Sequence, residues 1–484
     1  MYDPSSPLLF SSGLFLFMFA GFMLFYSMLN RATMARIIYV LLFSLFFYYK
    51  TSGIYVLLLV GVSISDFVAG QLMARSIDSL RRKKVLICSL AINLSVLAYF
   101  KYTNFFIEIF NGLAGSDFMD FKNIFLPVGI SFFLFQSISY TVDIYKGRLK
   151  PLDNWLDYLF YLSFFPQLVA GPIVRASDFI PQIRQKPLVI SHKMFMRGAM
   201  LILLGLVKKA VISDFISYHF VDKVFESPLY YTGFTNLMAI YGYALQIYCD
   251  FSGYSDMAIG IALLLGFRFN KNFDDPYKSA TITEFWRRWH ISLSSWLRDY
   301  LYISLGGNRK GRLRTYVNLM LTMLLGGLWH GAAMRFVLWG GLHGLALALH
   351  KFLMSLFPRL KTMGVNMKLP WRIAGVVLTF HIVCLGWLLF RAPDMQTCGL
   401  MLSSIFSDFG VDTIPQVLEL FWATFVLMLF GYALHFIPSR VQQKAKEKFD
   451  NLTIYGLSAI FVIVIWIIMQ LKSAEVQPFI YFQF

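Results

Sequence analysis

Charged residues are scarce in this sequence, and their scarcity excludes most classes of protein. Asp, Glu, Lys and Arg together make up 14% of its 484 residues, whereas a typical soluble domain contains about 25%. Hydrophobic residues make up 58%, and phenylalanine alone occurs 50 times. Such a chain cannot build an ordinary water-facing surface, so a soluble enzyme and a disordered chain are both excluded. The composition predicts an integral membrane protein.

Cysteine is also rare, with four residues: Cys88, Cys249, Cys384 and Cys398. Four cysteines in a chain of this length exclude a disulfide-rich secreted scaffold. The first three lie in or beside apolar segments, and their spacing does not match that of metal ligands. We therefore expect free, packed thiols and no structural metal.

Acidic residues are outnumbered by basic ones, 26 to 43, which gives a net charge of +17. The basic residues occupy short loops between apolar runs, which is the positive-inside pattern of a membrane protein facing anionic lipid. Membrane lipids, and not nucleic acid, are therefore the expected partner of this charge. Loops 31–36, 75–84 and 440–448 should be cytoplasmic, which places the N-terminus and the tail 472–484 on the far side.

Apolar runs recur almost to the end of the chain: 8–29, 37–49, 54–72, 85–100, 124–140, 156–174, 195–213, 229–267, 315–355, 373–390, 417–437 and 452–471. A spanning helix needs about 20 residues, so the shorter runs predict re-entrant or buried helices around a cavity. The first run is too long for a signal peptide and is expected to remain as a helix. The fold class is therefore an all-α polytopic membrane protein, with about a dozen spanning or re-entrant helices in a single domain, 1–484.

The segment Asp274–Thr315 breaks this pattern, because it is amphipathic, basic and rich in tryptophan. Thr281 or Thr283 is available as an N-cap, and Gly306-Gly307 as a stop. The more common role of such a segment is a surface helix anchored among lipid headgroups, here by Trp286, Trp289 and Trp296. The alternative is a basic mouth for a phosphorylated or otherwise anionic donor. That mouth would contain Arg287, Arg288 and Arg298.

His330 is the most notable polar residue in apolar surroundings. It ends the run Tyr316–Trp329, within a stretch that contains Gly326, Gly327 and Gly331. These glycines let neighbouring helices or a substrate approach closely. Burial favours a neutral imidazole, the form that a general base requires. A core histidine bonded to a backbone carbonyl is the competing interpretation, and the residues alone favour it.

Four further polar residues have apolar neighbours. His290 lies near the basic segment and His343 in a second setting of glycine and tryptophan, and packing is the favoured role for each taken alone. Asp250 and Asp256 lie at a probable break between half-helices. There they can cap a helix, orient a histidine or bind a substrate hydroxyl, and capping is the most common use.

The last residues, Gln477–Phe484, are nearly all apolar although the charge pattern places them outside. An aromatic anchor at the membrane interface is the simpler explanation. The alternative is a tail that inserts into the cavity and brings the phenol of Tyr481 to the reaction centre.

Several of these segments together resemble the membrane-bound O-acyltransferase superfamily, and most closely its bacterial branch that includes the membrane subunit of alginate O-acetylation. The resemblance extends over the whole chain. The blocks that carry it are 127–140, 165–173, 250–260, 284–298 and 325–331.

The resemblance implies a ring of helices around a transmembrane tunnel, with donor entering from the cytoplasm. It implies that His330 is catalytic, in place of the core interpretation, and that His290 is a second functional residue. The expected substrate-binding residues are Asp250, Asp256, Trp329, Arg287, Arg288 and Arg298. An aromatic tail such as 479–484 is viewed in related systems as an acyl relay, which would make Tyr481 catalytic.

The implied reaction moves an acetyl group from a cytoplasmic thioester, with acetyl-CoA as co-substrate and no bound cofactor or metal, to an exported polysaccharide. Alginate is the first choice, and cellulose, peptidoglycan and teichoic acid are alternatives. The expected partner is a periplasmic polysaccharide O-acetyltransferase or esterase-like subunit, and the expected location is the bacterial inner membrane. A transporter or flippase without covalent chemistry is the hypothesis from another class, although the internal symmetry typical of transporters is not evident.

Overall fold

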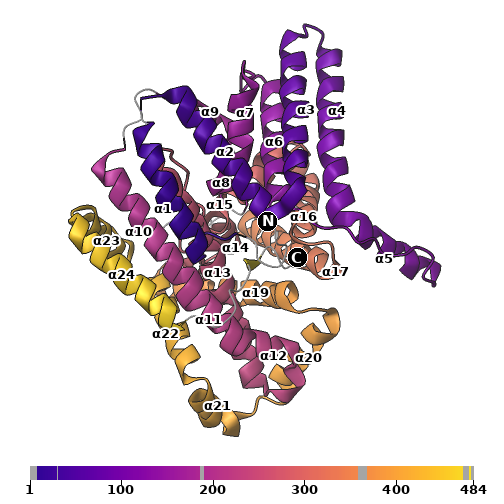
Figure 1. The fold of residues 1–484 in the computed structure, drawn as a ribbon. Helices are drawn as coiled ribbons and strands as arrows, with labels where there is room; N and C mark the ends of the chain where they lie inside the picture. Colours follow the sequence, from indigo (N-terminus) through magenta and orange to yellow (C-terminus); the bar gives the residue numbers. More distant parts are fainter. Residues whose placement is uncertain are drawn as a thin grey trace. The chain divides into compact units, whose positions relative to one another are not determined.

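The computed structural model describes residues 8–29, 31–169, 171–185, 190–357, 368–471 and 479–480. All regular structure within these ranges is helical (Figure 1), which confirms the predicted all-α class. The chain forms two compact units. Unit 1 contains Met1–Ala199 and Ala258–Asn270, and unit 2 contains Met200–Met257 and Lys271–Phe484.

The helices of unit 1 are α1 (Gly13–Met28), α2 (Thr33–Ser52), α3 (Val56–Arg75), α4 (Ser79–Leu97), α5 (Thr103–Ala114), α6 (Ile130–Tyr145), α7 (Trp155–Ser163), α8 (Phe165–Leu168) and α9 (Ala176–Ile183). Two helices run from one unit into the other: α10 (His192–Leu206) and α13 (Gly233–Leu264).

The remaining helices belong to unit 2: α11 (Asp214–Ile216), α12 (Asp222–Glu226), α14 (Ile282–Arg288), α15 (Ile291–Trp296), α16 (Gly311–His330), α17 (Met334–Leu356), α19 (Leu369–Arg391), α20 (Met395–Ser407), α21 (Ile414–Leu420), α22 (Trp422–Phe436), α23 (Ser439–Asp450) and α24 (Ile454–Leu471). A π-helical stretch, η3 (Val207–Ser213), continues α10. Each apolar run identified in the sequence overlaps at least one of the helices in the two units.

Five helical segments in the described part of the chain are long and apolar enough to cross a membrane: Thr33–Arg75, Ser79–Ala114, Met334–Leu356, Leu369–Arg391 and Ile454–Leu471. A sixth arises if α21 and α22, which meet at a bend of 89°, are counted as one span. Several other apolar helices are shorter. Helices α7 and α8, for example, are buried throughout or nearly so, as membrane proteins require of helices too short to span.

A buried carboxylate joins three helices of unit 1, which lie alongside one another in Figure 1. Asp66 of α3 is fully buried. It accepts hydrogen bonds from Ser89 (2.6 Å) and Asn93 (3.1 Å) of α4, and from Ser137 of α6. Because an unsatisfied polar group is costly away from water, these bonds hold α3, α4 and α6 in one register.

Two blocks of the resemblance, 127–132 with 136–140 and 165–173, belong to this unit, and they meet where Gly129 lies against Leu168. Gly129 starts α6 with φ +74°, and a Cβ there would lie 2.3 Å from the carbonyl oxygen of Leu168. Only glycine fits such a position. The approach of α6 to the end of α8 therefore depends on this residue.

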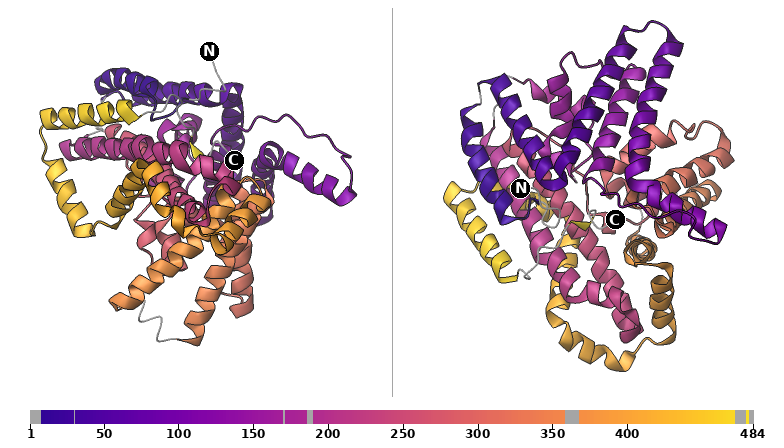
Figure 2. Two further views of the ribbon diagram at one scale, coloured as in Figure 1. Left: turned by 90° about the horizontal axis from the view of Figure 1, so that it is seen from below. Right: turned by 45° about the vertical axis from the view of Figure 1, so that its right-hand side comes forward.

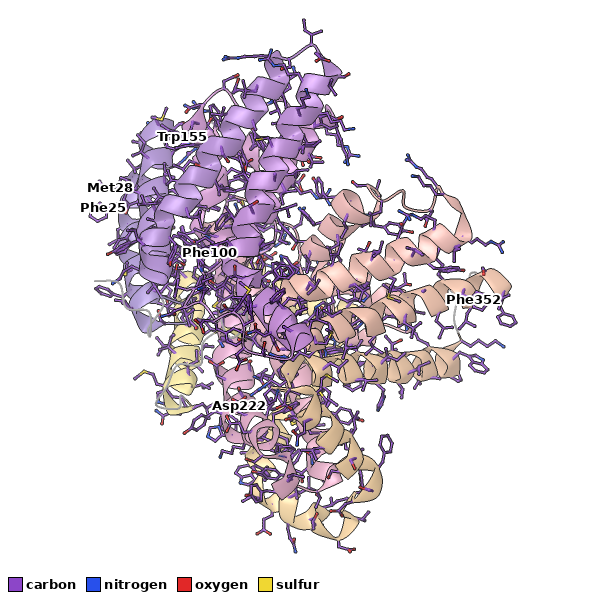
Figure 3. The ribbon with its side chains drawn as sticks, turned by 90° about the vertical axis from the view of Figure 1, so that its right-hand side faces the viewer. Phe25, Met28, Phe100, Trp155, Asp222 and Phe352 are labelled. Carbon is purple, nitrogen blue, oxygen red and sulfur yellow. The ribbon has the colours of Figure 1, made fainter. Side chains whose placement is uncertain are left out.

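Large apolar side chains project outward from several helices. Figure 3 shows Phe25 and Met28 on the outer face of α1, where they are 62% and 78% exposed. Phe352 projects near one end of α17, in the row formed by α16, α17 and α19 (Figures 2 and 3). Such surfaces suit hydrocarbon and not water. The protein is an integral membrane protein.

Candidate functional site

His330 is the last residue of α16, which packs along α17. A Cβ on Gly327 would lie 2.1 Å from the carbonyl oxygen of Phe336, and a Cβ on Gly340 would lie 2.3 Å from that of Met323. Of the glycines expected to permit close approach, Gly327 and Gly331 lie against Phe336 of α17, whereas Gly326 faces Leu297. The backbone contact fixes the end of α16 and, with it, the position of His330.

Aromatic rings surround His330, which is 4% exposed. Its ring centroid lies 4.9 Å from Trp329 and 4.9 Å from Trp339 of α17, with each pair edge-on. Phe390 of α19 lies 5.2 Å away. The apolar setting predicted for this imidazole is thus supplied by three rings from three helices.

His290 lies between α14 and α15 in a left-handed backbone conformation, with φ 41° and ψ 58°. A residue other than glycine pays of order 1–3 kcal/mol for such a conformation, and such strain often occurs at functional sites. The side chain is fully buried, and burial lowers the pKa of His290 to about 3. Its ring is therefore neutral at pH 7.

One tryptophan lies between the two histidines. The Trp329 centroid is 6.3 Å from that of His290 and 4.9 Å from that of His330. Residues 40 positions apart in the sequence thus share one cluster, which we call the histidine cluster: His290, Trp329, His330 and Trp339. His343 adjoins it, with its ring 4.7 Å from Trp339.

Asp250 and Asp256 were expected at a break between half-helices, and this expectation was wrong. Helix α13 is continuous from Gly233 to Leu264, so neither carboxylate caps a helix. Each forms an ion pair with a lysine in η3: Asp256 with Lys208 (2.6 Å) and Asp250 with Lys209 (2.6 Å). Lys209 also pairs with Asp214 (2.7 Å). A buried lysine between two carboxylates satisfies the charges that burial would otherwise penalise.

Glycines explain why these charges meet. A Cβ on Gly205 of α10 would lie 2.5 Å from the carbonyl oxygen of Gly253 in α13, and a Cβ on Gly253 would lie 2.8 Å from that of Gly205. Neither lysine was among the residues expected at the site. The signal was present, because Lys208 and Lys209 interrupt the apolar run 195–213, where a charge is costly.

The C-terminal tail is buried where the structure describes it. Phe479 and Ile480 are 0% and 3% exposed. The amide of Ile480 donates a hydrogen bond to Asp250 (3.0 Å), and the ring of Phe479 lies 4.8 Å from that of Tyr254. An anchor at the membrane surface was the favoured expectation, and these two residues contradict it. Tyr481 lies outside the described residues.

Two of the three arginines expected in the basic mouth form ion pairs with carboxylates. Arg288 pairs with Glu284 (2.9 Å), and Arg298 pairs with Asp299 (2.6 Å), whereas Arg287 is exposed. The hydrogen bond that Arg298 donates to Asp299 raises the pKa of Arg298. Four more exposed cations follow in the turn and at the start of α16: Arg309, Lys310, Arg312 and Arg314. Among the described residues of this segment, the exposed positive charge without an ion pair therefore lies at Arg287 and in the stretch 309–314.

The tryptophans of this segment were expected in the headgroup layer, and two of them are instead buried. Trp289 is 3% exposed and packs on Trp387 of α19 at 4.8 Å; Trp296 is 7% exposed. Helix α14 begins as expected, with Thr281 as its N-cap. The segment thus forms part of the interior around the histidine cluster.

Comparison with known proteins identifies the class. Residues 146–390 match the membrane-bound O-acyltransferase family. A probable alginate O-acetylase of Pseudomonas putida is 36% identical, over 99% of this chain and all of its own. The peptidoglycan O-acetyltransferase of Helicobacter pylori is 36% identical over 84% of this chain and 81% of its own. The teichoic acid D-alanyltransferase of Bacillus subtilis is 28% identical over 57% of this chain and 71% of its own.

The chain therefore belongs to the membrane-bound O-acyltransferase family, and it is an O-acyltransferase. The resemblance noted in the sequence is confirmed, and an enzyme replaces a transporter as the class of protein. Three blocks of that resemblance, 250–260, 284–298 and 325–331, contain Phe251, His290 and Trp329-His330. Two ring contacts join them, because Phe251 lies 4.5 Å and Trp329 6.3 Å from His290.

Proposed function

We propose that this protein transfers an acetyl group from a cytoplasmic thioester, acetyl-CoA, for the O-acetylation of an exported polysaccharide, with alginate as the first choice. The names of the Pseudomonas putida and Helicobacter pylori relatives support acetyl transfer. One observation carries the assignment of the centre: His290 and His330, from separate blocks, contact the same buried tryptophan. Cellulose, peptidoglycan and teichoic acid are the alternative acceptors.

In the proposed reaction His330 is the general base. It removes the proton of the acceptor hydroxyl while the hydroxyl oxygen bonds to the thioester carbonyl carbon. The carbon–sulfur bond then breaks, and the imidazolium returns its proton to the leaving thiolate. Proton removal of this kind is worth about 10² to 10⁴ in rate, and His290 assists as the second imidazole.

The donor carries several negative charges and should remain on the cytoplasmic side. The exposed cations Arg287, Arg309, Lys310, Arg312 and Arg314 support recognition of such a donor there. Because Arg288 and Arg298 are paired with carboxylates, their contribution to donor binding should be the smaller. The protein itself needs no resident cofactor in this scheme.

The tail supports an acyl relay on Tyr481. Phe479 lies 5.6 Å from Phe251, and Phe251 lies 4.5 Å from His290, so one ring separates the described tail from an imidazole. In the relay, the acetyl group passes from sulfur to the phenol oxygen, and the phenol proton passes through imidazole to the thiolate. An aryl ester is activated, because phenol has a pKa of about 10. A later acceptor hydroxyl takes the acetyl group, and Tyr481 regains a proton.

The location and partner complete the proposal. The relatives with O-acetyltransferase names come from bacteria, so the bacterial inner membrane is the proposed site, crossed several times. A separate periplasmic O-acetyltransferase or esterase-like subunit would pass the acetyl group to the polymer. Asp256 and Trp329 are proposed to bind substrate. Asp250 accepts a hydrogen bond from the amide of Ile480, so its proposed role is to hold the tail.

The test uses purified full-length protein in lipid nanodiscs with radiolabelled acetyl-CoA. We expect CoA release and a labelled C-terminal peptide with wild-type protein, loss of both with His330→Ala, and loss of the label with Tyr481→Phe. Release that persists unchanged in His330→Ala would refute the base. An unlabelled tail, together with full activity of Tyr481→Phe in cells, would refute the relay. The polymer whose acetate content falls on gene deletion identifies the acceptor.

A further inference from the structure

Asn272 makes hydrogen bonds that bear on which ring nitrogen of His290 is protonated. It is 1% exposed and lies in the segment that follows α13. Its backbone carbonyl accepts from the amide of Ile291 (2.8 Å), and the amide of Asp274 donates to the carbonyl of Arg288 (2.9 Å). These two backbone bonds place the side chain of Asn272 directly beside His290.

The side-chain bonds identify the oxygen of the Asn272 amide without ambiguity. One side-chain atom accepts from the backbone N–H of Ser292 at 3.1 Å and from the Ser292 hydroxyl at 2.9 Å. A backbone N–H can only donate, so this atom is Oδ1. The amide nitrogen Nδ2 points the other way and donates to the hydroxyl of Ser255 in α13 at 3.0 Å.

The same Oδ1 lies 3.2 Å from Nδ1 of His290. Because an amide oxygen accepts and does not donate, this hydrogen bond requires a proton on Nδ1. The Ser292 hydroxyl also lies 3.3 Å from Nδ1, but its single proton is donated to Oδ1, so it accepts from Nδ1. A neutral imidazole has one protonated nitrogen, so its lone pair is on Nε2. Burial keeps the ring neutral, since it lowers the pKa of His290 to about 3. Phe251, edge-on at 4.5 Å, restricts the ring plane.

We infer that Asn272 is a positioning residue for acyl transfer: it fixes His290 as the Nδ1-protonated tautomer and presents Nε2 as the hydrogen-bond acceptor. The inference rests on the proposed function, in which His290 assists His330 in handling the proton of the acceptor hydroxyl. Ser255 and Ser292 complete the arrangement, since each binds the Asn272 amide from a different element. No covalent bond changes at Asn272.

The test compares Asn272→Ala with Asn272→Asp in full-length protein in nanodiscs, with acetyl-CoA as donor and CoA release as the readout. Alanine removes the acceptor of the Nδ1 proton, so kcat should fall about tenfold or more, with KM for acetyl-CoA within about twofold of wild type. Aspartate keeps an oxygen toward both Nδ1 and the Ser292 amide. It should restore most of kcat.

The pH dependence of activity distinguishes a positioning role of Asn272 from a packing role. A carboxylate beside Nδ1 stabilises the imidazolium and raises the pKa of His290, so Asn272→Asp should lose activity at a higher pH on the acid side than wild type. Asn236 provides a matched control, since it is a buried asparagine of unit 2 whose amide donates to the backbone carbonyls of Tyr231 and Thr232. Asn236→Ala should lower thermal stability and leave the shape of the pH profile unchanged.

A measurement independent of activity distinguishes this inference from the proposed function. Nitrogen-15 spectra of histidine-labelled protein, assigned with His290→Gln, report which ring nitrogen is protonated. The inference is overturned if Nε2 is the protonated nitrogen, or if Asn272→Ala keeps the wild-type kcat and pH profile. Either result overturns it even if His330→Ala is inactive. Protonation at Nδ1 in a protein that releases no CoA overturns the proposed function and leaves the tautomer assignment standing.

Discussion

At the scale of single residues, the site depends on conformations that a sequence does not display. Asp275 and His290 are the two residues other than glycine with positive φ in the part of the chain that the structure describes. His290 lies within, and Asp275 directly after, the segments 288–291 and 272–274, which pair through backbone hydrogen bonds. The apolar setting and the resemblance identified His290, but neither revealed its strained backbone or its hydrogen bond to Asn272.

His343 provides a residue-scale prediction, because its packing role can be separated from catalysis. It is fully buried, and in the described part of the chain neither ring nitrogen has a hydrogen-bond partner. Replacing such a group with an apolar one is often neutral or stabilising. Leucine is the suitable replacement for His343. Nε2 of His343 lies so close to Gly386 that a Cβ on this glycine would be only 2.8 Å away, so a ring longer than imidazole would collide with the backbone there.

His343→Leu should therefore unfold at the same temperature as wild type or higher and keep acyl transfer within about twofold. Thermal unfolding in nanodiscs and CoA release measure the two effects. An inactive but folded His343→Leu protein would place His343 in the chemistry instead.

At the scale of elements, glycines determine which helices touch. Gly327 of α16 lies against the carbonyl of Phe336, so Gly327→Ala must separate α16 from α17, and overpacking of this kind costs typically 1–3 kcal/mol. Gly341 of α17 is the matched control, since the nearest atom to its Cβ would be 3.8 Å away. We expect Gly327→Ala to lower both thermal stability and kcat, and Gly341→Ala to resemble wild type. Equal behaviour of the two variants would show that the close contact is unimportant.

The paired lysines of η3 give a second prediction at this scale. Lys209 and Asp250 are each 3% exposed at the side chain, whereas Lys208 and Asp256 are 25% and 21% exposed. Lys209→Met leaves two carboxylates without their cation, and breaking a buried pair costs about 3–5 kcal/mol. Lys208→Met should cost clearly less. Denaturation of the two variants side by side measures the difference, and a Lys209→Met protein as stable as Lys208→Met would contradict it.

At the scale of the whole molecule, the charge pattern predicts sidedness in the membrane. The exposed basic helix α23 should be cytoplasmic, and the loop around Asp117, which follows the span Ser79–Ala114, should be on the far side. Single cysteines are introduced at Lys446 or Asp117 after Cys88, which is exposed, is changed to serine. An impermeant maleimide should label Asp117→Cys in intact spheroplasts and Lys446→Cys only after permeabilisation. The reverse result would invert the topology.

Much of the helical content was predictable, because helices in a membrane protein require apolar runs, and each run overlaps at least one helix. The break expected at Asp250 and Asp256 was the main error in the fold. Charges inside an apolar run indicate a break when no partner is visible in the sequence. Here the partners were Lys208 and Lys209, which are 48 and 41 positions away from Asp256 and Asp250 and reach them only through the contact of Gly205 with Gly253.

The sequence by itself determined the class of protein and the family, since composition and long ordered blocks are local properties that survive without coordinates. It also singled out His330, because an ionisable group in an apolar run is costly wherever the run folds, and the resemblance added the functional roles expected for His330 and His290. Only the tertiary structure decided that both rings contact Trp329, that Asp250 binds the tail, and that Asn272 holds the proton of His290 on Nδ1. Each of these depends on hydrogen bonds or ring contacts between distant segments, whose pairing is fixed by packing and not by sequence spacing.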